Sequence, residues 1–133
     1  MITVWDGEVT PEYWRSNITN VVGAEAWADA VKIISDQRRA TLVGFTNEVL
    51  DSMVAIYRAE LDVSVEPRRM ALIAADSWSQ ADYFRDAATR AGALVTVCNS
   101  VSLAARTLGL DLDHVVATIE ALRDELARGA RGH

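Results

Sequence analysis

The chain is poor in cysteine, in proline and in long apolar runs. Its 133 residues include one cysteine, Cys98, and two prolines. A single cysteine excludes an internal disulfide and is typical of a reducing compartment. The longest apolar runs reach only about six residues, whereas a helix that crosses a bilayer needs about 20. The first residues, MITVWDGE, lack the basic start and apolar core of a signal peptide. We therefore expect a cytoplasmic protein without a membrane span.

Basic clusters are also scarce. The formal net charge is −6, and Arg38-Arg39 and Arg68-Arg69 are no more than pairs. A nucleic-acid surface needs clustered Lys and Arg to meet the phosphates, so nucleic acid is not an expected partner. Apolar residues make up 50% of the chain and charged residues 24%, as in ordinary globular proteins. The length corresponds to about one domain with a core of its own.

Short apolar runs alternate with helical periodicity along the chain. Strands are predicted at residues 2–5, 31–36, 69–75 and 93–98, and helices at 11–22, 47–61, 77–91, about 100–108 and about 112–128. The run MALIAA is apolar at every position, which suits a strand covered on both faces. The alternation predicts an α/β fold: an open, mainly parallel four-stranded sheet with helices packed on it.

The last predicted helix is the part whose packing is hardest to assign. We expect a single domain at residues 1–128, with 110–128 as a C-terminal helical extension and 129–133 as a disordered tail. One face of the helix is apolar at Leu112, Val115, Val116, Ile119, Leu122 and Leu126. This face is expected to be buried, either on the chain's own core or on a second copy in a homodimer.

Polar residues at predicted strand ends and helix starts define the candidate site. Its members are Asp36, Thr46, Asp76, Ser77 and Asn99. In a parallel sheet these positions gather at the carboxyl edge, where such folds place their sites. Ser77 and Gln80 form an S-x-x-Q capping box, and Asn99 or Ser100 is expected to cap the short helix. Helix N-termini favour an anion, whereas the strand-end Asp residues oppose one, so weak anion binding or none is expected at the Asp36 side, and the region near Ser77 and Asn99 is favoured over it.

Each candidate has a structural alternative. Thr46 is either a helix cap or a phosphorylation site at a helix N-terminus. Asp6, Asp36 and Asp76 either cap turns or hold Mg²⁺ together, and turn capping is the favoured interpretation. Cys98 ends an apolar run and is expected to be a small buried side chain. No catalytic triad, glycine-rich phosphate loop or zinc-ligand spacing is present in the sequence, so no catalytic residue, metal or cofactor is predicted.

Four segments together carry a family resemblance. They are the strand that reaches Asp36-Gln37-Arg38, then RRMALIAADS, then YFRDAATRAG, and finally ALVTVCNSVSLAARTLG. Over residues 1 to 110 this pattern resembles the SpoIIAA-like proteins, small bacterial α/β proteins related to STAS and SEC14 domains. The resemblance implies a non-enzymatic regulatory or protein-interaction module. A binder of a small anionic or lipid-like ligand, as in SEC14-related domains, is the alternative.

The resemblance also has departures. Related anti-sigma factor antagonists carry a phosphorylatable Ser or Thr in a D-S-[ST]-G pattern, and Thr46 occupies the corresponding place in GFTN. Gly44 replaces the Asp of that pattern, and Asn47 replaces the Gly. The family usually opens with a β-hairpin, whereas only one strand is evident here.

Overall fold

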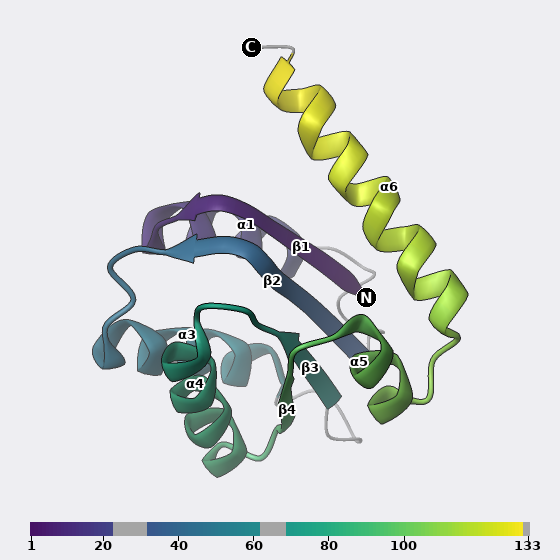
Figure 1. Ribbon diagram of the computed structural model, residues 1–133. Helices are drawn as coiled ribbons and strands as arrows, with labels where there is room; N and C mark the ends of the chain where they lie inside the picture. Colours follow the sequence, from purple (N-terminus) through teal and green to yellow (C-terminus); the bar gives the residue numbers. More distant parts are fainter. Residues whose placement is uncertain (23–31, 62–68, 132–133) are drawn as a thin grey trace.

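The structure, a computed structural model, describes residues 1–22, 32–61 and 69–131. Its elements are β1 (Ile2–Val9), α1 (Pro11–Val22), β2 (Lys32–Leu42), α3 (Asn47–Leu61), β3 (Arg69–Ile73), α4 (Trp78–Arg90), β4 (Leu94–Cys98), α5 (Val101–Leu108) and α6 (Leu112–Arg131). All strand pairs are parallel, and the strands lie in the order β1-β2-β3-β4 (Figure 1). The predicted open, parallel, four-stranded α/β sheet is confirmed.

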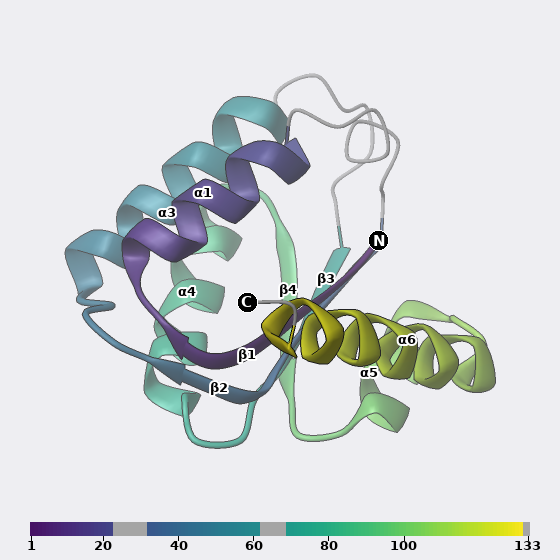
Figure 2. The ribbon, with the colours of Figure 1, turned by 90° about the horizontal axis from the view of Figure 1, so that it is seen from above.

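The helices cover the sheet unequally. Because the strands follow one another in chain order, crossovers of one hand place their helices on one face of the sheet. Accordingly α1, α3 and α4 pack on one face, through Trp14, Leu50 and Phe84 among others. The other face is covered by α5 and α6, where Leu108 and Ile119 are buried (Figure 2). With a helical layer on each side, β3 is buried from Met70 to Ile73, as predicted for MALIAA.

Two strands are longer than the sequence predicts. β1 continues to Val9 rather than ending at residue 5, and β2 passes through Asp36 and continues to Leu42. Beyond a register irregularity between Val4 and Asp6, the two strands pair again as far as Val9 and Leu42. The prediction failed because the added segments, DGE and QRRAT, are polar. These polar segments belong to the sheet because backbone pairing between β1 and β2 resumes at Asp6 and Arg39 and continues to Val9 and Leu42.

The last helix is partly buried and partly free. Val115 and Ile119, in its first half, are buried in the core shared with α5 and the sheet. Leu122 is half-buried, whereas Leu112 and Leu126 are exposed, so the prediction that the whole apolar face is buried is wrong at its two ends. The helix continues to Arg131, past residue 128 where the tail was expected to begin. The C-terminal half of α6 therefore extends away from the sheet (Figure 1). Trp27, expected to cover the core, lies outside the described residues.

Candidate functional site

The structure separates two residues that the sequence places together. Asp36 lies within β2, and six further strand residues, 37–42, follow it before the link to Thr46. At about 3.3 Å per residue, these six residues extend roughly 20 Å. The predicted convergence of Asp36 and Thr46 at one edge is therefore wrong. Asp6 also lies within its strand rather than after it.

Thr46 caps α3 as predicted. Its hydroxyl oxygen accepts a hydrogen bond from the backbone N–H of Val49 at 3.3 Å. The residue is exposed, and the chain reaches it through Gly44, whose φ of 79° is a conformation that favours glycine. The cap satisfies one backbone donor that α3 itself leaves unpaired.

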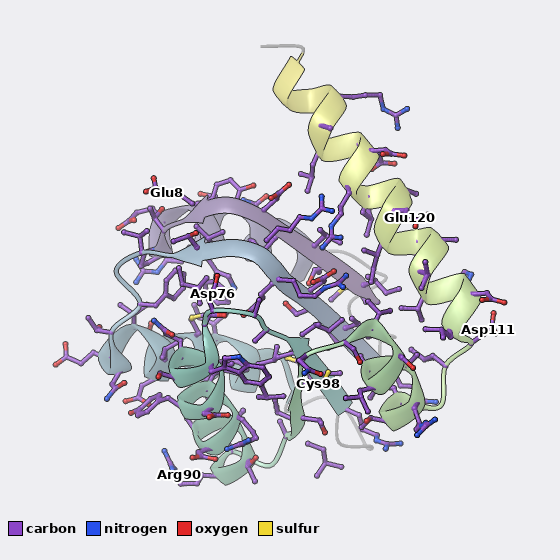
Figure 3. All side chains as sticks on the ribbon, in the orientation of Figure 1. Glu8, Asp76, Arg90, Cys98, Asp111 and Glu120 are labelled. Carbon is purple, nitrogen blue, oxygen red and sulfur yellow. The ribbon has the colours of Figure 1, made fainter. Side chains whose placement is uncertain are left out.

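The loops after β3 and β4 do hold Asp76, Ser77 and Asn99. Asp76 and Asn99 are exposed, and Figure 3 shows Asp76 in the loop that leads into α4. Ser77 is buried, and its hydroxyl has neither a capping bond nor another hydrogen-bond partner among the described residues. The predicted capping box is wrong, because Ser77 has φ −99° and ψ 34° instead of the extended backbone of a usual cap.

Ser100, rather than Asn99, caps the short helix α5. Its backbone is extended, and its hydroxyl accepts from the backbone N–H of Leu103 at 3.2 Å. At the other end Gly109 adopts the left-handed conformation, with φ 67°, and ends α5.

Asp36 is the centre of a partly buried cluster of hydrogen-bonded and charged groups. Its carboxylate is fully buried and accepts hydrogen bonds from the Nε and Nη2 of Arg38, at 3.0 and 2.8 Å. The backbone N–H of Arg38 donates a third bond at 3.1 Å. Arg123, 87 positions away on α6, donates a fourth from its Nη2 at 2.8 Å. These bonds connect the middle of β2 to the last helix.

The charges in this cluster hold Asp36 in its ionised form. Burial of the carboxyl opposes ionisation, but the hydrogen bonds of Arg38 and the charges of Arg38 and Arg123 outweigh it. The pKa of Asp36 is consequently below its ordinary value. The same bond to Asp36 raises the pKa of Arg38. One carboxylate thus meets two guanidinium groups, which is an arrangement for fixing α6 rather than for proton transfer.

Cys98 lies in the same row of the sheet. Asp36 pairs with Ile73, and Ile73 with Cys98, so all three are at one level across β2, β3 and β4. Cys98 is buried, as predicted (Figure 3), and burial raises the pKa of its thiol. A protonated, buried thiol is a poor nucleophile.

The carboxylates of Asp6, Asp36 and Asp76 do not come together as a metal site. Asp36 is bonded to two arginines, whereas Asp6 and Asp76 are exposed on different elements. Within residues 1–22, 32–61 and 69–131, no group of three His, Cys, Asp or Glu side chains could hold a metal ion.

A large open groove runs along the outer edge of β1, and the sequence analysis did not predict it. Its volume is about 940 Å³, and its walls come from α1 on one side and the C-terminal half of α6 on the other (Figure 2). The described residues that line it are Ile2, Thr3, Val4, Trp5, Asp6, Gly7, Tyr13, Asn17, Leu122, Glu125, Leu126, Ala127 and Gly129. No described strand pairs with this edge, so alternate backbone N–H and C=O groups of β1 face the groove.

A second hollow lies inside the molecule. It is between the sheet and α1, α3 and α4, and its lining is mainly apolar, with polar groups from Ser35, Gln37 and Gln80. The cavity has a volume of about 40 Å³. Pockets that hold drug-sized ligands usually measure about 300–1,000 Å³, so this cavity is too small for such a ligand.

Comparisons with known proteins find no match: no family model, no curated protein and no solved structure is similar to the chain. In the described part of the chain, none of the helices has the length and apolar character needed to cross a membrane.

Proposed function

We propose that the protein is a cytoplasmic, non-enzymatic regulatory module that binds another protein along the outer edge of β1. The observation that carries this proposal is the groove, which combines apolar side chains from α6 with a strand edge that no other described strand pairs with. Leu126 is 38% exposed, and Tyr13 on the opposite wall is 45% exposed. An exposed edge strand beside an apolar wall is a frequent site for strand addition by a partner.

The cluster of Asp36, Arg38 and Arg123 supports this proposal, because it holds α6, one wall of the groove, in a fixed position. Arg123 is bonded to Asp36 at 2.8 Å and stands next to Leu122 on α6. The bond fixes α6 close to the turn where Leu122 begins to line the groove. A preformed wall lowers the entropy that a partner loses on binding, which favours recognition.

The resemblance to SpoIIAA-like proteins agrees with a module of this kind. The groove includes part of the C-terminal extension, which lies beyond the family-like residues 1–110. Thr46 does not line the groove. Its hydrogen bond as the N-cap of α3 is a sufficient structural reason for a threonine at this position. Phosphorylation of Thr46 is therefore a separate proposal, tested by comparing the partners of Thr46→Glu and Thr46→Ala variants.

The alternative, a binder of a small anionic or lipid-like ligand, has weaker support. The internal cavity of about 40 Å³ has room for a few water molecules, not for an acyl chain. Its polar groups come from one serine and two glutamines, none of which is charged. Neither the size nor the charge of this cavity favours such a ligand.

A homodimer through α6 is a further possibility for the same surface. Val115 and Ile119 are buried in the chain's own core, so of the predicted apolar face mainly the C-terminal half of α6 and the exposed Leu112 are left for a second copy. The dimer interface would then coincide with the groove, so a second copy and a different partner would compete for it.

The experiment is capture of partners from host lysate, followed by reconstitution with the purified partner. Leu126→Asn replaces an apolar side chain of the groove with a polar, uncharged one, and Leu103→Asn makes the same change at an exposed leucine of α5. We expect the purified partner to bind the unmodified chain and Leu103→Asn, and to lose affinity for Leu126→Asn. Equal affinity for both variants would contradict the proposal.

A further inference from the structure

We infer that the partner of the groove is an extended segment that pairs with β1 and carries Lys or Arg opposite Asp6 and Glu125. This inference rests on the proposed function and adds the chemistry of the partner. It follows from the direction of the side chains along β1 and from the charges of the groove.

The edge of β1 offers alternating contacts to an added strand. Ile2 and Val4 pack on the side of the sheet that α6 covers, whereas Trp5 packs on the side of α1. Trp5 also meets Tyr13 of α1 in an edge-to-face contact, with ring centroids 6.2 Å apart. Side chains of a paired segment point alternately to the two faces. One set would therefore contact Leu122 and the other would contact Tyr13.

The charged residues of the groove are of one sign. Asp6 and Glu125 are both exposed, and no Lys or Arg is among the described residues that line the groove. Asp6 comes from β1 and Glu125 from the α6 wall, so two of the elements that border the groove contribute an acidic group to it. Complementary charge steers a partner to its site and excludes partners of the wrong sign.

The same charges disfavour a second copy of the chain. A two-fold interface brings the same patch of both copies together. Two copies would place two Asp6 and two Glu125 side chains in one interface, and no basic residue is among the described lining residues to compensate. A basic, partly apolar segment of another protein meets both the apolar walls and the acidic groups.

The test is selection from a display library of random linear peptides against the full chain. Peptides that also bind Leu126→Asn are removed, which leaves only those that depend on the apolar wall of the groove; the substitution is uncharged, because an added carboxylate would itself attract a basic segment. We expect the remaining peptides to be enriched about tenfold or more in Lys and Arg over Asp and Glu. An Asp6→Lys, Glu125→Lys double variant should reverse the preference to acidic peptides. The control is Glu120→Lys, an exposed position of α6 outside the groove lining, and it should leave the preference unchanged.

The outcomes separate this inference from the proposed function. Groove-dependent peptides without a charge preference would contradict the inference that the partner segment is basic, but they would leave the proposed function in place. If no such peptides emerge, and light scattering shows a dimer that Leu126→Asn dissociates, the occupant is a second copy and the inference is wrong. A monomer that selects no groove-dependent peptide would contradict both proposals.

Discussion

Asp36 is the residue on which the position of α6 depends. A buried carboxylate is costly unless its lone pairs are satisfied, and here four donor atoms from Arg38 and Arg123 satisfy them. Removing the carboxylate charge leaves two guanidinium groups without their shared partner, one of them largely buried on α6.

We predict that Asp36→Asn lowers the free energy of unfolding by about 3 kcal/mol, in line with the loss of one member of a buried ion pair. Urea denaturation followed by circular dichroism measures the change. Asp76→Asn is the matched control, because Asp76 is exposed, and it should change stability by no more than about 0.5 kcal/mol. Equal stability of the two variants would contradict the role assigned to the cluster.

The same residue predicts a pH dependence. The folded pKa of Asp36 is lowered below its unfolded value, so its charge stabilises the fold at pH values above the unfolded pKa, about 3.9. That contribution is lost as the pH falls through the folded pKa. The difference in unfolding free energy between the unmodified chain and Asp36→Asn should therefore be constant near pH 7 and shrink below about pH 4. If the stability difference between the two proteins grows on acidification instead, the pKa of Asp36 is not lowered in the folded protein.

Two hydroxyl groups at the starts of helices make opposite contributions. The hydroxyl of Thr46 accepts a bond from Val49, whereas that of Ser77 is buried without a described partner. We predict that Thr46→Ala costs about 1 kcal/mol of stability, as for a lost N-cap. Ser77→Ala should be neutral or slightly stabilising, because it removes an unsatisfied buried polar group. Thermal denaturation of both variants distinguishes them, and a larger loss for Ser77→Ala would point to an undetected role for its hydroxyl.

At the scale of elements, the sequence predicts the helices better than the ends of the strands. The face of α3 repeats with helical spacing, and Thr46 marks its start, so its bounds of Asn47 and Leu61 were predicted correctly. Among the described strands, residues 39–42 of β2 pair with β1 alone, and residues 37–38 lie at the register irregularity; the letters of this segment, QRRATL, carry little apolar signal. Strand pairing held by backbone bonds leaves no such pattern in the side chains.

The link between β2 and α6 was beyond the reach of sequence reasoning for a different reason. Arg123 is one of several arginines in the predicted last helix and its tail. Nothing in the residues next to it in the sequence identifies Asp36, 87 positions away, as its partner. The Asp-x-Arg pattern at Asp36 and Arg38 was visible, and in a strand those two side chains point to the same face. Arg123, the third residue of the cluster, can be assigned to Asp36 only once the packing of α6 is known.

At the scale of the whole molecule, one face of the sheet is closed by three helices and the other by two. α6 begins on the core and then leaves the sheet, so it forms a wall beside β1 instead of covering it (Figure 1). The groove arises from this departure and from the position of β1 at the end of the strand order. Only the tertiary arrangement brings these features together, which is why the individual segments did not predict the groove.

Hydrogen exchange of the chain, with and without its purified partner, is the measurement that tests the central claim most directly. If the partner adds a strand to β1, backbone amides within residues 2–7 should be protected on binding, because an added strand accepts hydrogen bonds from the outward-facing N–H groups. Protection at the groove-facing residues of α6, 122–129, should accompany it. Protection confined to the start of α3 around Thr46, with residues 2–7 unchanged, would contradict the account.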